Sequence, residues 1–322
     1  MKRQLRSAIG LAVAGVALWL AFSGVDFRAL ETAFRAADPV WLAAAAVSVF
    51  VTITFVVLRL RLLASGWSDS PSFRLLWHLT IVGQVANIVV PFRLGDGVKI
   101  ASASRGLGLP PAAAGAIVAV ERLLDALALV LAAVLLLVFG AAPGWTRPVL
   151  ASAAAVGLIG VAIGLAAAKW IAHGKTAAPL ARFQRLSGFL ARHLELVRRG
   201  AAAAGAPAVA VRLVGGSGAI VLASAFTNLL TIRAFDPSVP AAAALLLLVL
   251  VQSGNALAAA PGGVGVSQFV AVETLGLWDV PPATALACSL ALFAIVRVPK
   301  IAMLPGALAA VSAARDAASV KS

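Results

Sequence analysis

Residues 84–97 read Gln-Val-Ala-Asn-Ile-Val-Val-Pro-Phe-Arg-Leu-Gly-Asp-Gly, and they interrupt an otherwise apolar stretch of the chain. Proline removes a backbone donor and glycine permits positive φ, so a helix is expected to break here. Residues 252–265 repeat the pattern, since both segments carry Gln-x-x-Asn followed by Pro-x-x-aliphatic-Gly. This recurrence predicts an internal repeat built around two broken helical elements, residues 75–105 and 240–277.

The composition around these segments is that of a membrane protein. Of the 322 residues, 62% are hydrophobic and 12% are charged, and the mean hydropathy is +1.02. Soluble domains carry about 25% charged residues. Several apolar stretches approach the roughly 20 residues that a helix needs to cross a bilayer core. They include residues 8–23, 40–58, 126–142 and 148–168. We therefore predict an all-α polytopic membrane helix bundle, forming a single integral membrane domain over residues 1–322.

The basic residues indicate how this bundle is oriented. Most of the 26 Lys and Arg residues lie in the amino terminus, residues 59–105, the loop 169–212 and the carboxyl tail. The positive-inside rule places these segments in the cytoplasm. Both termini are therefore expected to be cytoplasmic, in a multi-pass protein of the cell inner or plasma membrane.

The same rule makes the first broken element re-entrant. Arg74 precedes it and Arg105 ends it, so both of its ends face the cytoplasm. The second broken element enters from the opposite side, which relates the halves 1–170 and 213–322 as inverted repeats. Non-helical backbone at membrane depth is tolerated only where protein or a wet cavity surrounds it.

The basic loop 171–212 carries apolar residues at helical spacing between its arginines. The apolar residues are Leu180, Phe183, Leu190, Leu194 and Val197. The loop is either a solvated charged segment or an amphipathic helix on the anionic cytoplasmic leaflet, where each basic residue contributes about 1 kcal/mol. The net charge of +14 does not indicate nucleic-acid binding, because the basic residues lie in blocks between apolar spans.

Three charged residues are expected within the hydrocarbon core. Glu121, Arg122 and Asp125 lie about 14 Å or more along a helix that starts near residue 112. Arg122 is three residues from Asp125 and can pair with it. Such groups line a bundle interior, either as part of a pathway or as a structural ion network that sets helix register.

Further charged residues follow the breaks. Arg93, Asp96 and Lys99 follow the first, Glu273 follows the second, and Arg297 and Lys300 interrupt the last apolar segment. Arginine binds phosphate bidentately and helix amino termini favour anions, so these residues suit an anionic headgroup. Arg297 and Lys300 equally suit the point at which the last span reaches the cytoplasm.

Neither the cysteine nor the histidines indicate a metal or redox centre. Cys288 is the single cysteine, so intramolecular disulfides are excluded. His78, His173 and His193 are far apart in sequence and match no metal-ligand spacing. No cofactor is expected.

At Pro91-Phe-Arg-Leu-Gly-Asp-Gly, Glu121-Arg122-x-x-Asp125 and Pro261-Gly-Gly-Val-Gly265, the sequence resembles the lysylphosphatidylglycerol synthase transmembrane-region family of flippase-like membrane proteins. The resemblance covers essentially the whole chain. It implies an inner-membrane bundle, which in full-length synthases moves aminoacylated phospholipid between leaflets. Those synthases also carry a soluble aminoacyltransferase domain. This chain ends at Ser322 without one, so that activity is not expected.

The resemblance also implies a set of site residues. Carried over by motif, they are Pro91, Arg93, Gly95, Asp96, Glu121, Arg122, Asp125, Pro261, Gly262, Gly263 and Gly265. The residues themselves add Gln84, Asn87, Lys99, Gln252, Asn255, Glu273, Arg297 and Lys300 as candidates for binding a lipid headgroup. Asp96 stands where many relatives carry Glu, which shortens the reach of that carboxylate.

Three functions fit the sequence. The first is a flippase-like protein that moves a polar, anionic or phosphate-bearing headgroup. Without a nucleotide-binding loop its movement is passive or ion-coupled, with Glu121, Asp125 or Glu273 as proton carriers. The second is a membrane enzyme acting on a polyprenyl or sterol-like lipid through Asp96, Glu121 and Asp125. The third is a non-catalytic partner that positions a lipid-modifying enzyme through the loop 171–212.

Overall fold

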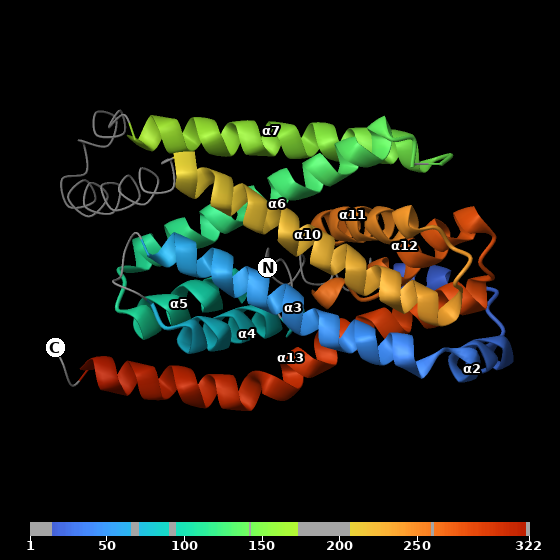
Figure 1. Cartoon of the computed structure of the whole chain (residues 1–322), viewed down its shortest axis with the longest axis horizontal. Helices are drawn as coiled ribbons and strands as arrows, with labels where there is room; N and C mark the ends of the chain where they lie inside the picture. Colours follow the sequence, from blue (N-terminus) through green and yellow to red (C-terminus); the bar gives the residue numbers. More distant parts are fainter. Residues whose placement is uncertain are drawn as a thin grey trace, which may run out of the picture.

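Every regular element in the described part of the chain is a helix, as the composition predicts (Figure 1). The computed structural model describes residues 15–65, 71–89, 95–141, 143–172, 207–258 and 261–319. Part of the first predicted helix, most of the amphipathic loop, Pro91 and Arg93 lie outside these residues. The described part of the first helix is helical over residues 15–22.

The described residues form five long helices, three of which overlap the predicted stretches 40–58, 126–142 and 148–168. They are α3 (Pro39–Ala64), α6 (Pro111–Val138), α7 (Thr146–Ala172), α10 (Pro207–Phe235) and α13 (Pro282–Ser319). Within the described residues, α3, α7, α10 and α13 contain stretches long and apolar enough to cross a membrane. Helix α6 is 28 residues long and apolar along most of its length, but it carries the charged residues discussed below. The chain is thus a polytopic helix bundle.

Both broken elements form a pair of helices around a break. The first comprises α4 (Phe73–Val89) and α5 (Gly95–Leu107), which pack against each other. The second comprises α11 (Ala241–Ala258), the short 3-10 helix η2 (Pro261–Gly263) and α12 (Val266–Leu275), followed by η3 (Gly276–Trp278). Helices α11 and α12 also pack against each other, so each broken element is a helical hairpin. The predicted breaks are confirmed.

The structure differs from prediction in the last segment and near the amino terminus. Arg297 to Lys300 do not interrupt the last span, because α13 continues as one helix through Pro299 and Pro305. A proline removes one helical hydrogen bond, and neighbouring helices can compensate for this in a bundle. Helix α2 (Phe27–Ala36) was not predicted. It begins where the Asp26 carboxylate accepts a hydrogen bond from the Arg28 amide at 2.9 Å.

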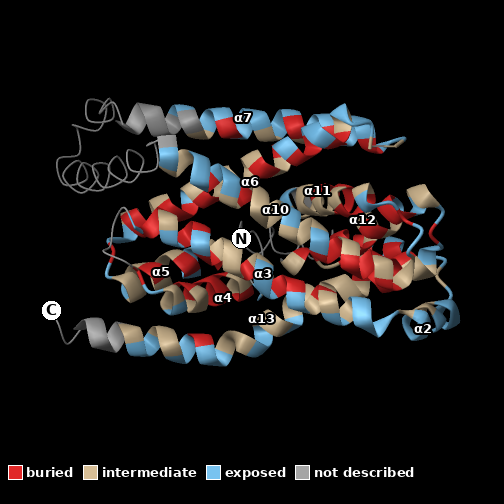
Figure 2. Ribbon diagram, in the orientation of Figure 1, coloured by how far each residue is buried: buried red, intermediate tan, exposed pale blue. Residues whose placement is uncertain are grey.

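Helices α3 and α10 form the most extensive helix pair and run antiparallel. The Asp38 amide donates to the Ala234 carbonyl at one end, and the Ser48 and Thr227 hydroxyls lie 2.8 Å apart further along. Figure 2 shows that buried residues concentrate in the middle of the bundle, around α4 and α11, whereas α7 and the end of α13 are mostly exposed. The exposed residues on α7 are largely apolar, as expected of a surface that faces lipid.

Candidate functional site

The charged residues of α6 form an ion-pair network with residues of two other helices, α3 and α5. The Lys99 ammonium lies 2.6 Å from Oε2 of Glu121, and the Arg59 guanidinium lies 2.7 Å from Oδ1 of Asp125. Arg122 donates from Nε and Nη2 to the two oxygens of Asp96, at 2.8 and 2.5 Å. Its Nη1 lies 3.2 Å from Asp125, so the predicted pair on α6 is confirmed.

This network joins α3, α5 and α6, and reaches α10. The link to α10 is the hydroxyl of Ser217, which accepts a hydrogen bond from Nη1 of Arg59 at 3.0 Å. Side-chain exposure is 3% for Arg59 and Glu121 but 35% for Asp125 and 36% for Arg122. The network therefore has a buried part and an accessible edge.

The network is electrically balanced. We define it as Arg59, Asp96, Lys99, Glu121, Arg122 and Asp125. Its three cations face three carboxylates, and every carboxylate contacts at least one cation. Unpaired charges in a low-dielectric interior are costly, whereas paired and hydrogen-bonded ones are tolerated. The network is therefore suited to stable burial, and it carries no net charge.

The tip of the first hairpin is built on glycines that let α5 approach α4. A Cβ added to Gly83 would lie 2.9 Å from Cγ of Lys99, so the absence of a side chain lets the Lys99 stem pass. A Cβ on Gly95 would lie 2.6 Å from Oδ1 of Asn87. The Asn87 side-chain amide in turn donates to Asp96 at 2.8 Å. The hairpin tip is thereby joined to the ion-pair network.

The tip of the second hairpin repeats this arrangement. A Cβ on Gly263 would collide with the side-chain amide of Asn255, as one on Gly95 would with that of Asn87. Gly262, Gly263 and Gly265 have φ of 58°, 69° and 82°, a region that residues with a side chain rarely adopt. The Gly265 amide donates to the Gln268 side chain at 2.8 Å, which fixes the start of α12.

The packing corrects the register of the internal repeat. The sequence motifs align Gly95 with Gly265, whereas the structure places Gly263 against Asn255 in the way that Gly95 lies against Asn87. In both hairpins the glycine follows the asparagine by eight residues. The proline follows the asparagine two residues sooner in the first hairpin than in the second. Aligning the two prolines therefore misaligned the glycines.

The two hairpin tips meet inside the bundle. Helix α4 packs against η2, and a Cβ on Gly262 would lie 3.0 Å from the carbonyl oxygen of Ile88. The Gly262 carbonyl accepts a hydrogen bond from Nη2 of Arg297 on α13. The Arg297 guanidinium also lies 3.5 Å from the ring centroid of Phe293, a cation–π contact one helical turn away.

Helix α13 carries two cations without a carboxylate partner among the described residues. Arg297 bonds to the Gly262 carbonyl, and half-buried Lys300 has no hydrogen bond or ion pair to any residue that the structure describes. Both residues lie within the stretch Pro282–Ala314, which is long and apolar enough to cross a membrane. Arg297 therefore brings a cation without a described carboxylate partner to the junction of the tips, and Lys300 follows it three residues later on α13.

Several side-chain oxygens at the tips are buried without a donor. They are Oε1 of Gln84, Oδ1 of Asn87 and Oδ1 of Asn255. The orientation of the Asn87 amide is fixed by its bond to Asp96, so its oxygen faces away from that carboxylate. A buried acceptor without a donor costs about 1–3 kcal/mol, and a water or ligand commonly supplies the missing hydrogen bond.

The remaining candidates lie less centrally. Glu273 is exposed on α12, and Gln252 is half-buried on α11. Pro261 begins η2, and Pro91 and Arg93 fall outside the described residues. No group of three or more His, Cys, Asp or Glu residues within the described ranges is placed to hold a metal ion.

Sequence reasoning missed Arg59, Ser217 and Gly83. Arg59 was counted with the basic region 59–105 that was expected to face the cytoplasm, yet only 3% of its side chain is exposed. An arginine just inside an apolar run can indicate a buried ion pair. In the sequence, however, it cannot be told from an arginine that marks the membrane boundary. Ser217 and Gly83 carried no signal, since small residues are common throughout membrane helices.

Comparison with known families fits this architecture. The model of the lysylphosphatidylglycerol synthase TM region matches residues 7–299. The chain belongs to this family. The match includes both hairpins, the ion-pair network and Arg297, and it associates the bundle with lipid modification or translocation. Neither the curated proteins nor the solved structures contain a match.

Proposed function

We propose that this member of the family binds a polar, phosphate-bearing lipid headgroup between its two hairpin tips and moves it across the bilayer. The observation that carries the proposal is the pair of cations on α13. Arg297 and Lys300 have no carboxylate partner in the described structure, whereas the nearby network is balanced. A phosphate would supply the missing negative charge, and a guanidinium beside an ammonium suits its oxygens.

A series of polar groups between the ion-pair network and the hairpin tips supports movement as well as binding. It leads from Asp125 through Arg122 and Asp96 to Asn87. Next to Asn87, the Ile88 carbonyl lies close to Gly262, whose own carbonyl accepts a hydrogen bond from Arg297. Polar groups at membrane depth commonly mark such pathways, and paired broken helices commonly bind the transported group. A headgroup could follow this path while its hydrocarbon chains stay in lipid.

The path also favours transport over catalysis. Each carboxylate of the network is held by a cation, so none is free to act as a general base.

The proposed setting is the cell inner membrane with both termini cytoplasmic. There the basic loop 171–212 contacts the anionic leaflet and offers a surface to a lipid-modifying enzyme.

The proposal is tested by replacing Lys300 with glutamine. Purified protein is reconstituted in phosphatidylcholine vesicles that contain a trace of fluorescent phosphatidylglycerol, and dithionite is added outside. The rate at which inner-leaflet fluorescence becomes quenched reports translocation. We expect Lys300→Gln to lower this rate by about tenfold or more, because a hydrogen bond to a charged group contributes about 1.5–3 kcal/mol.

Two controls separate function from folding. Arg28→Gln removes the same charge from an exposed position on α2 and is expected to keep the wild-type rate. The thermal unfolding temperature of Lys300→Gln should equal or exceed that of the wild type, since the lysine has no described partner to lose. Equal translocation by Lys300→Gln and wild type, or none by the wild type above empty vesicles, would contradict the proposal.

A further inference from the structure

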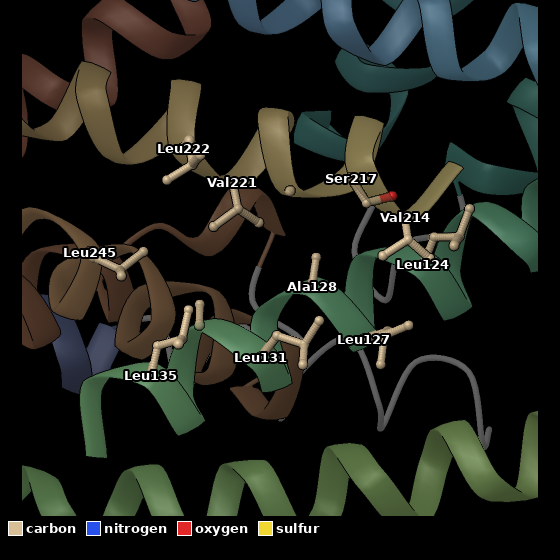
Figure 3. Close-up of a pocket in the computed structure, with 12 residues that line it drawn as sticks. Leu124, Leu127, Ala128, Leu131, Leu135, Val214, Ser217, Val221, Leu222 and Leu245 are labelled. Atoms are coloured by element: carbon tan, nitrogen blue, oxygen red, sulfur yellow. The ribbon is translucent and has the colours of Figure 1, made fainter. Parts of the chain in front are cut away.

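A largely apolar groove lies between α6 and α10, with one residue from α11 at its end (Figure 3). Its volume is about 230 Å³. The walls are leucine, valine and alanine, and Ser217 is the polar side chain among the residues that line it. This volume lies below the roughly 300–1,000 Å³ of drug-like ligand pockets, so it suits a narrow occupant rather than a compact molecule.

The length of the groove matches a single leaflet. On α6 it extends from Leu124 to Leu135, which is about 16 Å at 1.5 Å per residue. The hydrocarbon core of a bilayer is about 30 Å thick, so one leaflet contributes about 15 Å. The dimension therefore fits one hydrocarbon chain lying along the helix.

One end of the groove adjoins the ion-pair network. Ser217 lines this end and accepts from Arg59, which is paired with Asp125. Asp125 directly follows Leu124, another lining residue. Figure 3 shows Leu124 and Val214 at this end and Leu135 and Leu245 at the other. A groove that is polar at one end and apolar along its length is complementary to an amphiphile.

The rim of the groove is accessible from the surrounding bilayer. Leu131, Leu135, Val214 and Leu222 are lining residues that remain exposed. In a chain of this membrane family, exposed leucines along a long apolar helix face lipid rather than water. A lipid chain can therefore reach the groove sideways, without passing through the protein.

We infer that the groove holds one acyl chain of a phospholipid whose headgroup rests on the accessible edge formed by Arg122 and Asp125. This rests on the proposed function, because it takes the bound molecule to be the lipid that the protein handles. Arg122 is 36% exposed, and a guanidinium has five N–H donors, of which three are engaged in the structure. Its remaining donors are available to phosphate oxygens.

The groove also defines how the lipid is oriented. Helices α6 and α10 run in the same direction along it, since Leu124 lies near Val214 and Leu135 lies further along with Leu222 (Figure 3). The headgroup therefore points toward the ends at which both helices begin. On the proposed topology these ends are cytoplasmic. The groove then holds a lipid in its cytoplasmic-leaflet orientation, before it crosses.

Photo-crosslinking tests this inference on the full chain. The protein is reconstituted in phosphatidylglycerol vesicles with a trace of phosphatidylglycerol that carries a diazirine midway along one acyl chain. After irradiation, labelled peptides are mapped by mass spectrometry. We expect the label on groove residues of α6 and α10, such as Leu127, Leu131 and Val221.

A matched pair of glycine substitutions on α10 tests whether the label depends on the groove itself. A Cβ on Gly218 or on Gly215 would have no heavy atom within 4 Å, so a side chain can leave the backbone at either position without a clash. Only Gly218 lines the groove, and its leucine would fill it. Gly218→Leu should lower groove labelling by about tenfold, or about 1.4 kcal/mol, while Gly215→Leu leaves it unchanged. Arg122→Gln should lower labelling by the phospholipid but not by a diazirine-bearing alkane.

Two results would overturn the inference. One is equal groove labelling in Gly218→Leu and Gly215→Leu. The other is labelling of the groove no denser than that of the exposed face of α7, at Val156 and Ile159, which would indicate ordinary boundary lipid. If labelling behaves as expected while vesicles show no translocation, the chain site is supported and the proposed transport function fails.

Discussion

At the residue scale, the side chains that matter most are the charged ones buried between helices. Lys99 and Glu121 form the most enclosed pair, with side-chain exposures of 10% and 3%. Burying either charge alone is unfavourable, because the interior cannot replace the lost hydration. The pair is tolerated because the charges lie 2.6 Å apart, and because the glycine at position 83 leaves room for the lysine stem.

Removing one member of this pair should be more damaging than removing both. We expect Lys99→Met to destabilise the protein by about 3–5 kcal/mol, since it leaves the Glu121 carboxylate buried without a partner. The double variant Lys99→Met/Glu121→Met should recover most of that loss. Thermal unfolding in detergent measures both effects. Arg35→Met, which breaks an exposed pair with Glu31, is the control and should change little. A double variant no more stable than the single one would contradict this account.

At the element scale, the two hairpins depend on close backbone contact at their tips. In each hairpin an asparagine near the end of the first helix packs on a glycine of the returning segment. The same contact occurs in both hairpins, although the loops differ in sequence. The feature that the two hairpins share is thus the asparagine–glycine contact rather than the position of the proline.

Two glycines on α5 provide a direct test of that contact. A methyl group on Gly95 would lie 2.5 Å from the Ala86 carbonyl carbon, whereas one on Gly97 would have no heavy atom within 4 Å. We expect Gly95→Ala to destabilise the protein by about 1–3 kcal/mol through overpacking against backbone. Gly97→Ala should stabilise it by about 0.5–1 kcal/mol through helix propensity. Unfolding temperatures of the two variants give the comparison, and similar values would mean that the hairpin tip is not closely packed.

At the scale of the whole molecule, the contacts between helix ends show which of them lie at the same end of the bundle. Phe34 of α2 contacts Phe235 at the end of α10, and the Asp38 amide bonds to the Ala234 carbonyl. Because α3 starts at this end and runs antiparallel to α10, Ser65 after α3 lies at the opposite end. Arg61 lies in the last turn of α3, next to Ser65, and the topology predicted from the positive-inside rule puts this end in the cytoplasm.

Cysteine labelling tests this orientation. Cys288 is buried, so a Cys288→Ala background accepts single exposed cysteines at Ser65 or Ser238. A membrane-impermeant maleimide added to intact cells should label Ser238→Cys, and should label Ser65→Cys only after the membrane is permeabilised. The reverse pattern would invert the proposed topology, and with it the leaflet from which the α6–α10 groove takes its lipid.

The sequence by itself determined the membrane-embedded helical architecture, most span limits and the positions of both breaks. These depend on local properties: hydropathy over about 20 residues, and the inability of proline and glycine to continue a helix. It also predicted the Arg122–Asp125 pair, because residues three apart on a helix are neighbours. It placed a break in α13 wrongly, because packing lets a helix continue through a proline.

Only the tertiary structure decided which distant residues meet. The pairing of Arg59 with Asp125, of Lys99 with Glu121 and of Arg122 with Asp96 depends on how the three helices α3, α5 and α6 pack, and other pairings were equally compatible with the sequence. The asparagine–glycine register and the groove between α6 and α10 arise in the same way. Each is a property of surfaces brought together from separate parts of the chain, whereas a sequence pattern records only what one segment does alone.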